Sequence, residues 1–331
     1  MFGVVTWVLF LGSVILLSPP ETFEYLQGTE KNANLLVFIL LFVTNGSRLL
    51  PYFFRDNPIQ IMNSGVMLGS CAVQGIALSS SGLMMLFPTP VLVDQVTGTR
   101  VHLVRWVEWT ILSFLMTFLT EGIDLPNHKQ GEKLAWNHGI AIALSTVAGM
   151  IFPLCPDMYW WMLTFIISCV LFSSIYIRLH RRYERYKATE QGKGVEEEET
   201  YNRIRLSFRL IQVCSFMWTM LVVGFTVCNI GAAYASENSI LKNPANQLVV
   251  ESFFEVGSKI WYLNVIIEVH DLIFDEGSRA LRRLQELRDM MSIVWEDSSD
   301  VVALTIRANN RLITMVSPTF LQMPFNKKKE T

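Results

Sequence analysis

The stretch ESFFEVGSKIWYLNVIIEVH, residues 251–270, decides the fold, because it places one lysine at the centre of a largely apolar segment. Glu255 precedes Lys259 by four residues, so one helical turn would put both side chains on the same face. An ionisable group at the centre of a membrane helix is costly and usually marks a functional site. The alternative is a structural Lys/Glu pair between packed helices.

Composition places this segment in a membrane protein. Hydrophobic residues make up 51% of the 331 positions, charged residues only 17%, and the mean hydropathy is +0.34. We expect an all-α, multi-pass membrane protein. The net charge of -2 gives no indication of a nucleic-acid partner, because the charged residues are concentrated in a few loops and the C-terminal part.

The apolar runs predict a bundle of seven helices preceded by an extra one. Residues 1–18 form an apolar run that ends in Ser18-Pro19-Pro20, which favours an additional transmembrane helix; a signal peptide is the alternative. The seven further spans are predicted at 34–54, 59–87, 101–119, 134–152, 158–179, 206–230 and 251–270.

Two connections between the spans carry information. Residues 90–99 alternate apolar and polar side chains and contain a Thr-Gly turn signal, which predicts a short hairpin. Basic residues gather where the fifth span leads into the sixth, so we expect that side, and therefore the C-terminus, to be cytoplasmic. They include Arg178, Arg181, Arg182, Arg185, Lys187, Arg203, Arg205 and Arg209.

The C-terminal part changes character. Residues 275–296 repeat apolar side chains at alternating three- and four-residue spacing, which predicts a helical, coiled-coil linker and a homodimer; an amphipathic surface helix is the alternative. Residues 297–331 contain two strand-like runs around an Ala-Asn-Asn turn, which we interpret as the start of an output domain.

A second charged group lies in the third span, where Arg105 and Glu108 are three residues apart and face the same way. A lysine amine buried among apolar groups deprotonates readily and can form a Schiff base with an aldehyde, and the resulting iminium needs a carboxylate counter-ion. Glu108 and Glu255 are the candidates. Tryptophans at 109, 160, 161 and 218 and Phe225 suit the walls of a flat, conjugated ligand, although such rings are also common as interface anchors.

This set of residues resembles the microbial (type 1) rhodopsin family over residues 34–274. The similarity rests on an acid four residues before a last-helix lysine, on Arg105, Glu108 and Trp109, on the Trp160-Trp161 pair, and on Trp218 followed by Phe225. The resemblance implies all-trans retinal bound to Lys259 as a protonated Schiff base, with Glu108 and Glu255 as counter-ions and Arg105 stabilising them. The further pocket positions it implies are Trp109, Ser113, Trp161, Thr164, Trp218, Phe225 and Ser258.

Departures from the family pattern bear on function. The carboxylate that lies eleven residues after the counter-ion in outward proton pumps is Leu119 here, and the usual hydroxyl and proline nearby are Leu112 and Phe114. Ser113 is retained between them. Pumping is therefore disfavoured.

The extra N-terminal helix and the cytoplasmic continuation resemble the eight-helix enzyme-linked rhodopsins, with residues 297–331 similar to the first strands of a PAS domain. The leading hypothesis is a light sensor that signals through its last helix to a cytoplasmic output domain or partner, without being an enzyme itself. A light-gated channel or ion-transporting rhodopsin, including the rhodopsin part of a channel fusion, is the second hypothesis. A seven-helix protein with an accidental Lys/Glu pair is the third.

Overall fold

The computed structural model describes residues 2–51, 65–124, 129–191, 198–235, 239, 243 and 245–267. They belong to one compact unit, Met1–Ile273. The predicted linker at 275–296 and output domain at 297–331 lie outside the described residues, as do 52–54 and 59–64 of the first two predicted spans and 268–270 of the last.

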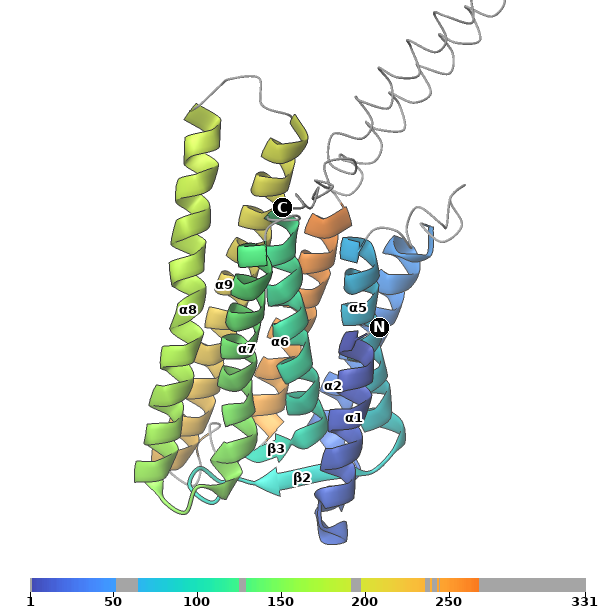
Figure 1. The fold of residues 1–331 in the computed structure, drawn as a ribbon. Coiled ribbons are helices and arrows are strands. Elements are labelled where there is room, and N and C mark those ends of the chain that lie inside the picture. The colour runs from blue at the N-terminus through green and yellow to red at the C-terminus, as the bar shows by residue number, and fades with distance from the viewer. Residues whose placement is uncertain are drawn as a thin grey trace, which may run out of the picture. The chain divides into compact units, whose positions relative to one another are not determined.

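Helices dominate the described part of the chain (Figure 1). We call the last one, at residues 245–267, the lysine helix. The labelled elements are α1 (Phe2–Leu17), η1 (Pro20–Thr22), β1 (Phe23–Glu24), α2 (Gly28–Arg48), α5 (Gly65–Leu86), β2 (Thr89–Val93), β3 (Arg100–His102), α6 (Leu103–Asp124), α7 (Lys129–Ile151), η2 (Phe152–Leu154), α8 (Met158–Gln191) and α9 (Glu198–Tyr234).

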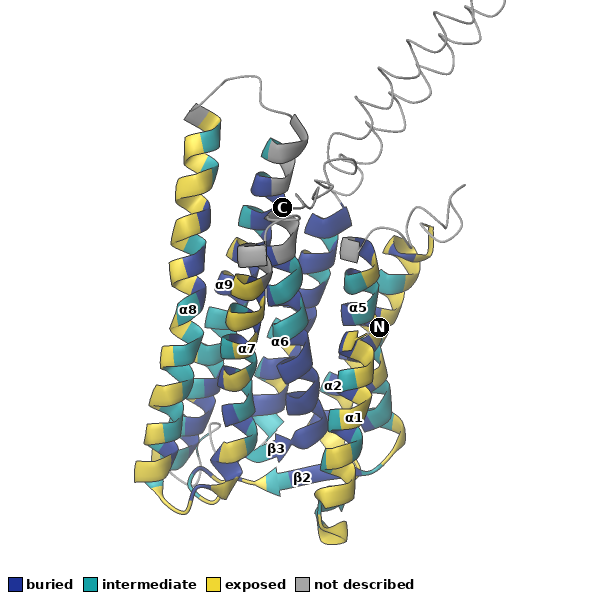
Figure 2. Ribbon diagram, in the orientation of Figure 1, coloured by how far each residue is buried: buried dark blue, intermediate teal, exposed yellow. Residues whose placement is uncertain are grey.

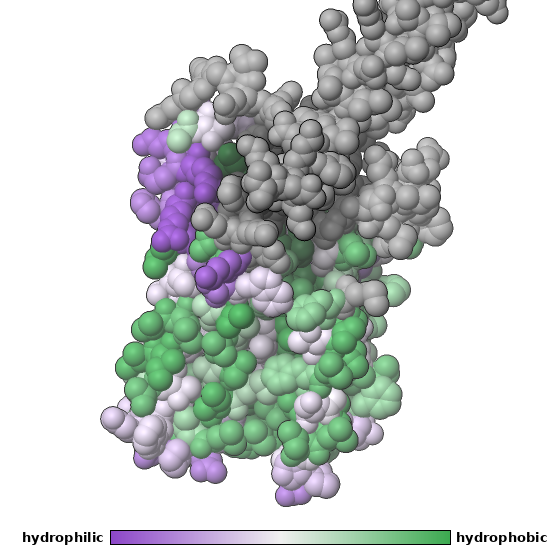
Figure 3. Space-filling view, in the orientation of Figure 1, coloured by the Kyte–Doolittle hydropathy of each residue, from purple (hydrophilic) through white to green (hydrophobic). Residues whose placement is uncertain are grey.

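Five of the described helices, α5 to α9, are long and apolar enough to cross a membrane. Figure 3 shows the matching surface, a band of hydrophobic residues with hydrophilic residues beyond it towards the C-terminal end of α8. The lysine helix carries Glu251, Glu255 and Lys259, so its composition alone is less apolar. The all-α, multi-pass membrane architecture predicted from the sequence is confirmed.

Helix α6 lies at the centre of the bundle. Buried residues make up 78% of the apolar stretch within Leu103–Glu121 but only 11% of the apolar stretch within Met158–Glu190 of α8 (Figure 2). Helices α1, α5, α7 and α9 all pack against α6. The predicted N-terminal helix is therefore formed, and it covers α6 through contacts such as that of Gly3 with Leu115.

The lysine helix lies beside α5, α6 and α9. Gln74 of α5 hydrogen-bonds its backbone, Tyr262 donates a hydrogen bond to the Met116 carbonyl of α6 at 3.3 Å, and Gly257 lies against Met217 of α9. Because α6 carries Glu108, this packing brings the two acids and the lysine to one place.

Prolines and an aspartate set the ends of three of these helices. Pro19 and Pro20 follow α1, and Pro153 lies in η2 directly after α7, where a proline ring cannot continue a regular α-helix. Asp157 begins α8, because its carboxylate accepts hydrogen bonds from the backbone N–H of Tyr159 and Trp160 at 2.9 and 3.1 Å.

A three-stranded antiparallel sheet of order β1-β2-β3 lies at one end of the bundle (Figure 1). The predicted hairpin is confirmed: Val91 pairs with His102 and Val93 with Arg100. Strand β1, which pairs Phe23 with Pro90, was not predicted, because two residues are too few to produce a periodic signal.

Several predicted boundaries were wrong. The third span starts at Leu103 rather than 101, since Val101 and His102 belong to β3. The connection between the third and fourth predicted spans, 101–119 and 134–152, is shorter than predicted, because α6 continues to Asp124 and α7 starts at Lys129. Helices α8 and α9 also extend well beyond their apolar runs. Hydropathy locates the apolar run of a helix but does not show how far the helix continues into polar sequence.

The hairpin turn generates a first prediction. Gly98 has a φ of 73°, and its N–H donates to the Asp94 carbonyl at 2.8 Å. Gly98→Ala should cost about 1–2 kcal/mol, since an L residue is strained in this conformation. Gly46→Ala, where an added Cβ meets nothing within 4 Å, is the control. Thermal unfolding followed by circular dichroism measures both, and equal melting temperatures would contradict the assignment.

Candidate functional site

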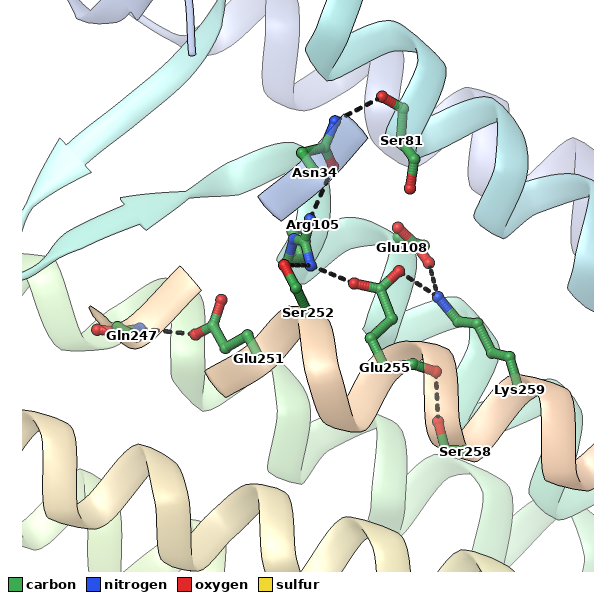
Figure 4. A network of polar contacts seen from close by, with 10 residues as sticks. All are labelled: Asn34, Ser81, Arg105, Glu108, Gln247, Glu251, Ser252, Glu255, Ser258 and Lys259. Atoms are coloured by element: carbon green, nitrogen blue, oxygen red, sulfur yellow. Dashed lines mark hydrogen bonds and ion pairs between the residues drawn. The ribbon is translucent and has the colours of Figure 1, made fainter. Parts of the chain in front are cut away.

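A buried cluster of four charges lies between α6 and the lysine helix (Figure 4). The Lys259 ammonium donates to one carboxylate oxygen of Glu108 and to one of Glu255, and the second oxygen of Glu255 accepts from Arg105. Lys259 is 3% exposed and Arg105 and Glu108 are 0% exposed. Two cations and two carboxylates thus balance one another away from solvent.

Helical spacing explains this meeting. Glu255 and Lys259 are one turn apart on the lysine helix, and Arg105 and Glu108 are almost one turn apart on α6. Arg105 is further held by Asn34 of α2, whose Oδ1 lies 2.9 Å from its guanidinium, and by the Ser252 hydroxyl at 3.3 Å. Asn34 in turn donates to the Ser81 carbonyl of α5 at 2.9 Å.

The lysine backbone is also fixed. The Gln74 side-chain amide donates to the carbonyl of Lys259 at 3.0 Å. The Ser258 hydroxyl donates to the carbonyl of Glu255 at 2.9 Å, inside the same helix. Contacts from α2, α5 and α6 therefore hold the amine in one position.

Lys259 opens onto a cavity with largely aromatic and aliphatic walls. The walls come from α6, α7, η2, α8, α9 and the lysine helix. They consist of Trp106, Trp109, Leu112, Ser113, Met116, Ile142, Ser145, Thr146, Gly149, Phe152, Phe165, Ser168, Cys169, Phe172, Trp218, Leu221, Val222, Phe225, Glu255, Ser258 and Lys259. An apolar cavity with a few convergent polar groups is typical of a small-molecule site.

Most residues proposed from the sequence lie at this cavity. Trp109, Ser113, Trp218, Phe225 and Ser258 line it together with Lys259 and Glu255. Glu108 and Arg105 belong to the charge cluster beside it.

Three predicted residues lie elsewhere, and the first of them, Trp160, is 51% exposed and does not line the cavity. Trp161 is fully buried behind the wall, stacked on Phe152 at 4.8 Å between ring centroids. The Thr164 hydroxyl lies 3.7 Å from Cys155 Sγ, and the neighbouring Phe165 lines the cavity instead. A tryptophan pair predicts an aromatic wall, but which ring faces the ligand depends on helix rotation.

Other lining residues were missed. Trp106 lies three residues before Trp109 on the same face of α6, so helical spacing could have found it. Gly149 could not be found in this way: an added Cβ there would lie 1.9 Å from the Trp106 ring. Gly149 therefore lets Trp106 lie flat against α7.

A second buried ion cluster lies near the C-terminal end of α6. Glu121 pairs with Arg178 and Arg182 of α8, and His138 Nδ1 of α7 lies 3.4 Å from the same carboxylate. Apolar side chains of α6, including Leu112, Met116 and Leu119, occupy the helix between Glu108 and Glu121. No carboxylate of α6 is thus available between the two clusters.

The sheet end has its own charged group. Arg100 pairs with Glu24 at 2.7 Å and with Glu30 at 3.2 Å, and His102 Nε2 lies 3.5 Å from Glu30. Burial lowers the pKa of the His102 imidazole, although the Glu30 carboxylate acts in the opposite direction. Burial of His102 therefore favours the neutral imidazole.

Comparison with known proteins identifies the fold. The transmembrane domain and linker region of Salpingoeca rosetta rhodopsin phosphodiesterase superposes with a TM-score of 0.61 at 16% identity, covering 86% of this chain and 94% of that one. Cyanorhodopsin from the cyanobacterium Calothrix gives 0.55 at 14% identity, covering 74% and 96%. The light-driven proton pump of Coccomyxa subellipsoidea gives 0.53 at 12% identity, covering 74% and 98%. No family model and no curated protein matches the sequence.

The described part of the chain therefore has the fold of a microbial rhodopsin. TM-scores of 0.53–0.61 establish this architecture. At identities of 12–16% the activity has to be argued from the site itself.

The charge cluster generates a second prediction. Arg105→Ala should destabilise the protein by about 3–5 kcal/mol, because it leaves a buried carboxylate without one of its partners. Arg181→Ala, at an exposed position of α8, should cost about 0.5 kcal/mol or less. Chemical unfolding in mixed micelles compares them. Equal losses would show that the Arg105 pair is not buried in the membrane-embedded protein.

Proposed function

We propose that this protein is a photoreceptor that holds all-trans retinal covalently on Lys259. The observation that carries the proposal is the buried amine of Lys259, held between Glu108 and Glu255 and facing an aromatic cavity. An amine nucleophile beside carboxylates suits reaction with an aldehyde. When bound, retinal supplies absorption of visible light and a change of shape.

The residues fit this ligand. Positive charge on Lys259 Nζ is balanced by the two carboxylates whether the nitrogen is free or bonded, so the cluster keeps its net charge. Arg105 orients Glu255 from the opposite side. Rings of Trp109, Trp218 and Phe225 offer flat surfaces to a conjugated chain.

The residues of α6 between Lys259 and the Glu121 cluster favour a signalling function over proton pumping. Leu119 takes the position of a proton-donating carboxylate, and the next acid along α6, Glu121, is held by Arg178 and Arg182. We infer that the change of shape passes along the lysine helix to residues 268–331. A homodimer, a cytoplasmic C-terminus and a separate output domain remain part of this proposal, and the chain itself is not assigned catalysis. The rhodopsin phosphodiesterase domain that it resembles is likewise a transmembrane domain with a linker.

Ion transport is the second candidate. The observation in its favour is the buried polar chain from Lys259 through Glu255 and Arg105 to Asn34 (Figure 4). Such a chain can carry protons or ions, and one structural neighbour is described as a light-driven proton pump.

Reconstitution with all-trans retinal tests the ligand. The wild-type protein should acquire a visible absorption band that Lys259→Ala abolishes, whereas Lys31→Ala, an exposed lysine of α2, should retain it. Dark and illuminated absorption spectra measure this. A visible band that persists in Lys259→Ala would refute the assignment.

Photocurrents separate the two candidate functions. Cells that express the full chain with retinal should show no stationary, voltage-dependent current under illumination, because the apolar segment and the Glu121 cluster close the path on one side of Lys259. Patch-clamp recording with and without light measures this. A sustained current absent from Lys259→Ala would establish transport instead of pure sensing.

A further inference from the structure

Asp94 in the turn between β2 and β3 joins the sheet to the wall of the cavity. It is 1% exposed, and its two carboxylate oxygens have different partners. Oδ1 accepts the backbone N–H groups of Val96 and Thr97 at 2.8 and 3.3 Å, which closes the turn. Oδ2 accepts the indole N–H of Trp161 at 2.8 Å. One carboxylate thus shapes the turn and holds a ring of α8.

Trp161 lies behind three aromatic rings that line the cavity. It stacks on Phe152, Phe165 and Phe225 with centroid distances of 4.8, 5.6 and 6.5 Å. All three phenylalanines line the cavity, while Trp161 is fully buried behind them. The interplanar angle between Trp161 and Phe225 is 3°, so the two rings lie parallel to each other.

The same turn holds α9. The hydroxyls of Thr97 and Thr99 donate to Asn229 Oδ1 at 3.3 and 2.8 Å. The Asn229 amide donates to the carbonyl of Phe225 one turn earlier, at 2.8 Å. Trp161 of α8 and the backbone of Phe225 in α9 are therefore both linked by hydrogen bonds to the same turn, which fixes the distance between them.

We infer that Asp94 is a positioning residue, which sets the shape of the aromatic end of the ligand cavity through the orientation of Trp161. Asp94 itself does not touch the ligand; it acts through Trp161 on Phe152, Phe165 and Phe225. The inference rests on the proposed function in taking retinal as the ligand. A buried carboxylate that accepts a charge-assisted hydrogen bond holds its partner more firmly than a neutral acceptor would.

Asp94→Asn tests this selectively. The amide oxygen still accepts from Val96 and Thr97 and preserves the turn, while the amide nitrogen faces the indole N–H donor to donor. In the reconstituted pigment we expect a shifted absorption maximum and several-fold faster bleaching by hydroxylamine. Trp161→Phe should change both in the same direction, and the double variant should change them no further, because both substitutions remove the same interaction.

Asp157→Asn is the matched control. Asp157 is a turn carboxylate before the same helix, and its Oδ1 accepts from Tyr159 and Trp160. Only its backbone carbonyl, which Asp157→Asn leaves unchanged, accepts the backbone N–H of Trp161, at 3.1 Å. The substitution should leave the absorption maximum and the bleaching rate as in the wild type. A wild-type pigment that requires Lys259, together with an Asp94→Asn variant that behaves like Asp157→Asn, would overturn the positioning role. That result would leave the proposed function standing.

The inference can still be tested if Asp94→Asn does not fold or if the wild type forms no pigment. If Asp94→Asn does not fold, Trp161→Phe alone decides: an unchanged absorption maximum and bleaching rate overturn the inference. If the wild type forms no pigment, the proposed function fails, and near-ultraviolet circular dichroism of the ligand-free chain tests the anchor. The tryptophan signal should then change in Asp94→Asn but not in Asp157→Asn, and an unchanged signal overturns the anchor.

Discussion

Ion pairing of Lys259, in a place without solvent, fixes how α6 and the lysine helix meet. An ammonium there would be costly alone, and it persists because Glu108 and Glu255 both reach its nitrogen. The arrangement needs two helices in a fixed register, since Glu108 comes from α6 and Glu255 from the lysine helix. Arg105 pairs with the second carboxylate oxygen of Glu255 and also donates to Ser252 and to Asn34, which brings α2 into the same network.

Around this cluster the bundle divides into parts with different physical roles. One side of the lysine is aromatic and enclosed, with rings held from behind by Trp161 and from the sheet by Asp94. Towards the C-terminal end of α6 no carboxylate follows Glu108 until Glu121, which lies between two arginines and ties α6 to α8. A change of shape at the lysine would meet a firmly anchored sheet end, so movement is expected at the opposite ends of the helices.

Sequence reasoning could predict those parts of the fold and site that follow from periodicity. Membrane helices, the pairing of Glu255 with Lys259 and the placement of Arg105 and Glu108 on one face of α6 all depend on helical spacing, and the hairpin depends on a turn signal. Contacts between distant segments leave no such trace. The Asn34–Arg105 and Gln74–Lys259 hydrogen bonds, the role of Gly149 beside Trp106, and the placement of Phe165 in preference to Thr164 depend on how each helix is rotated in the bundle.

Chemical trapping of the ligand tests the central claim most directly. Borohydride reduction of the illuminated and dark pigment, followed by proteolysis and mass spectrometry, identifies the nitrogen that carries retinal. We predict a single retinyl adduct, on the peptide that contains Lys259, because among the described residues that amine alone lies between Glu108 and Glu255 at the cavity. An adduct on another lysine, or a coloured protein without any adduct, would contradict it.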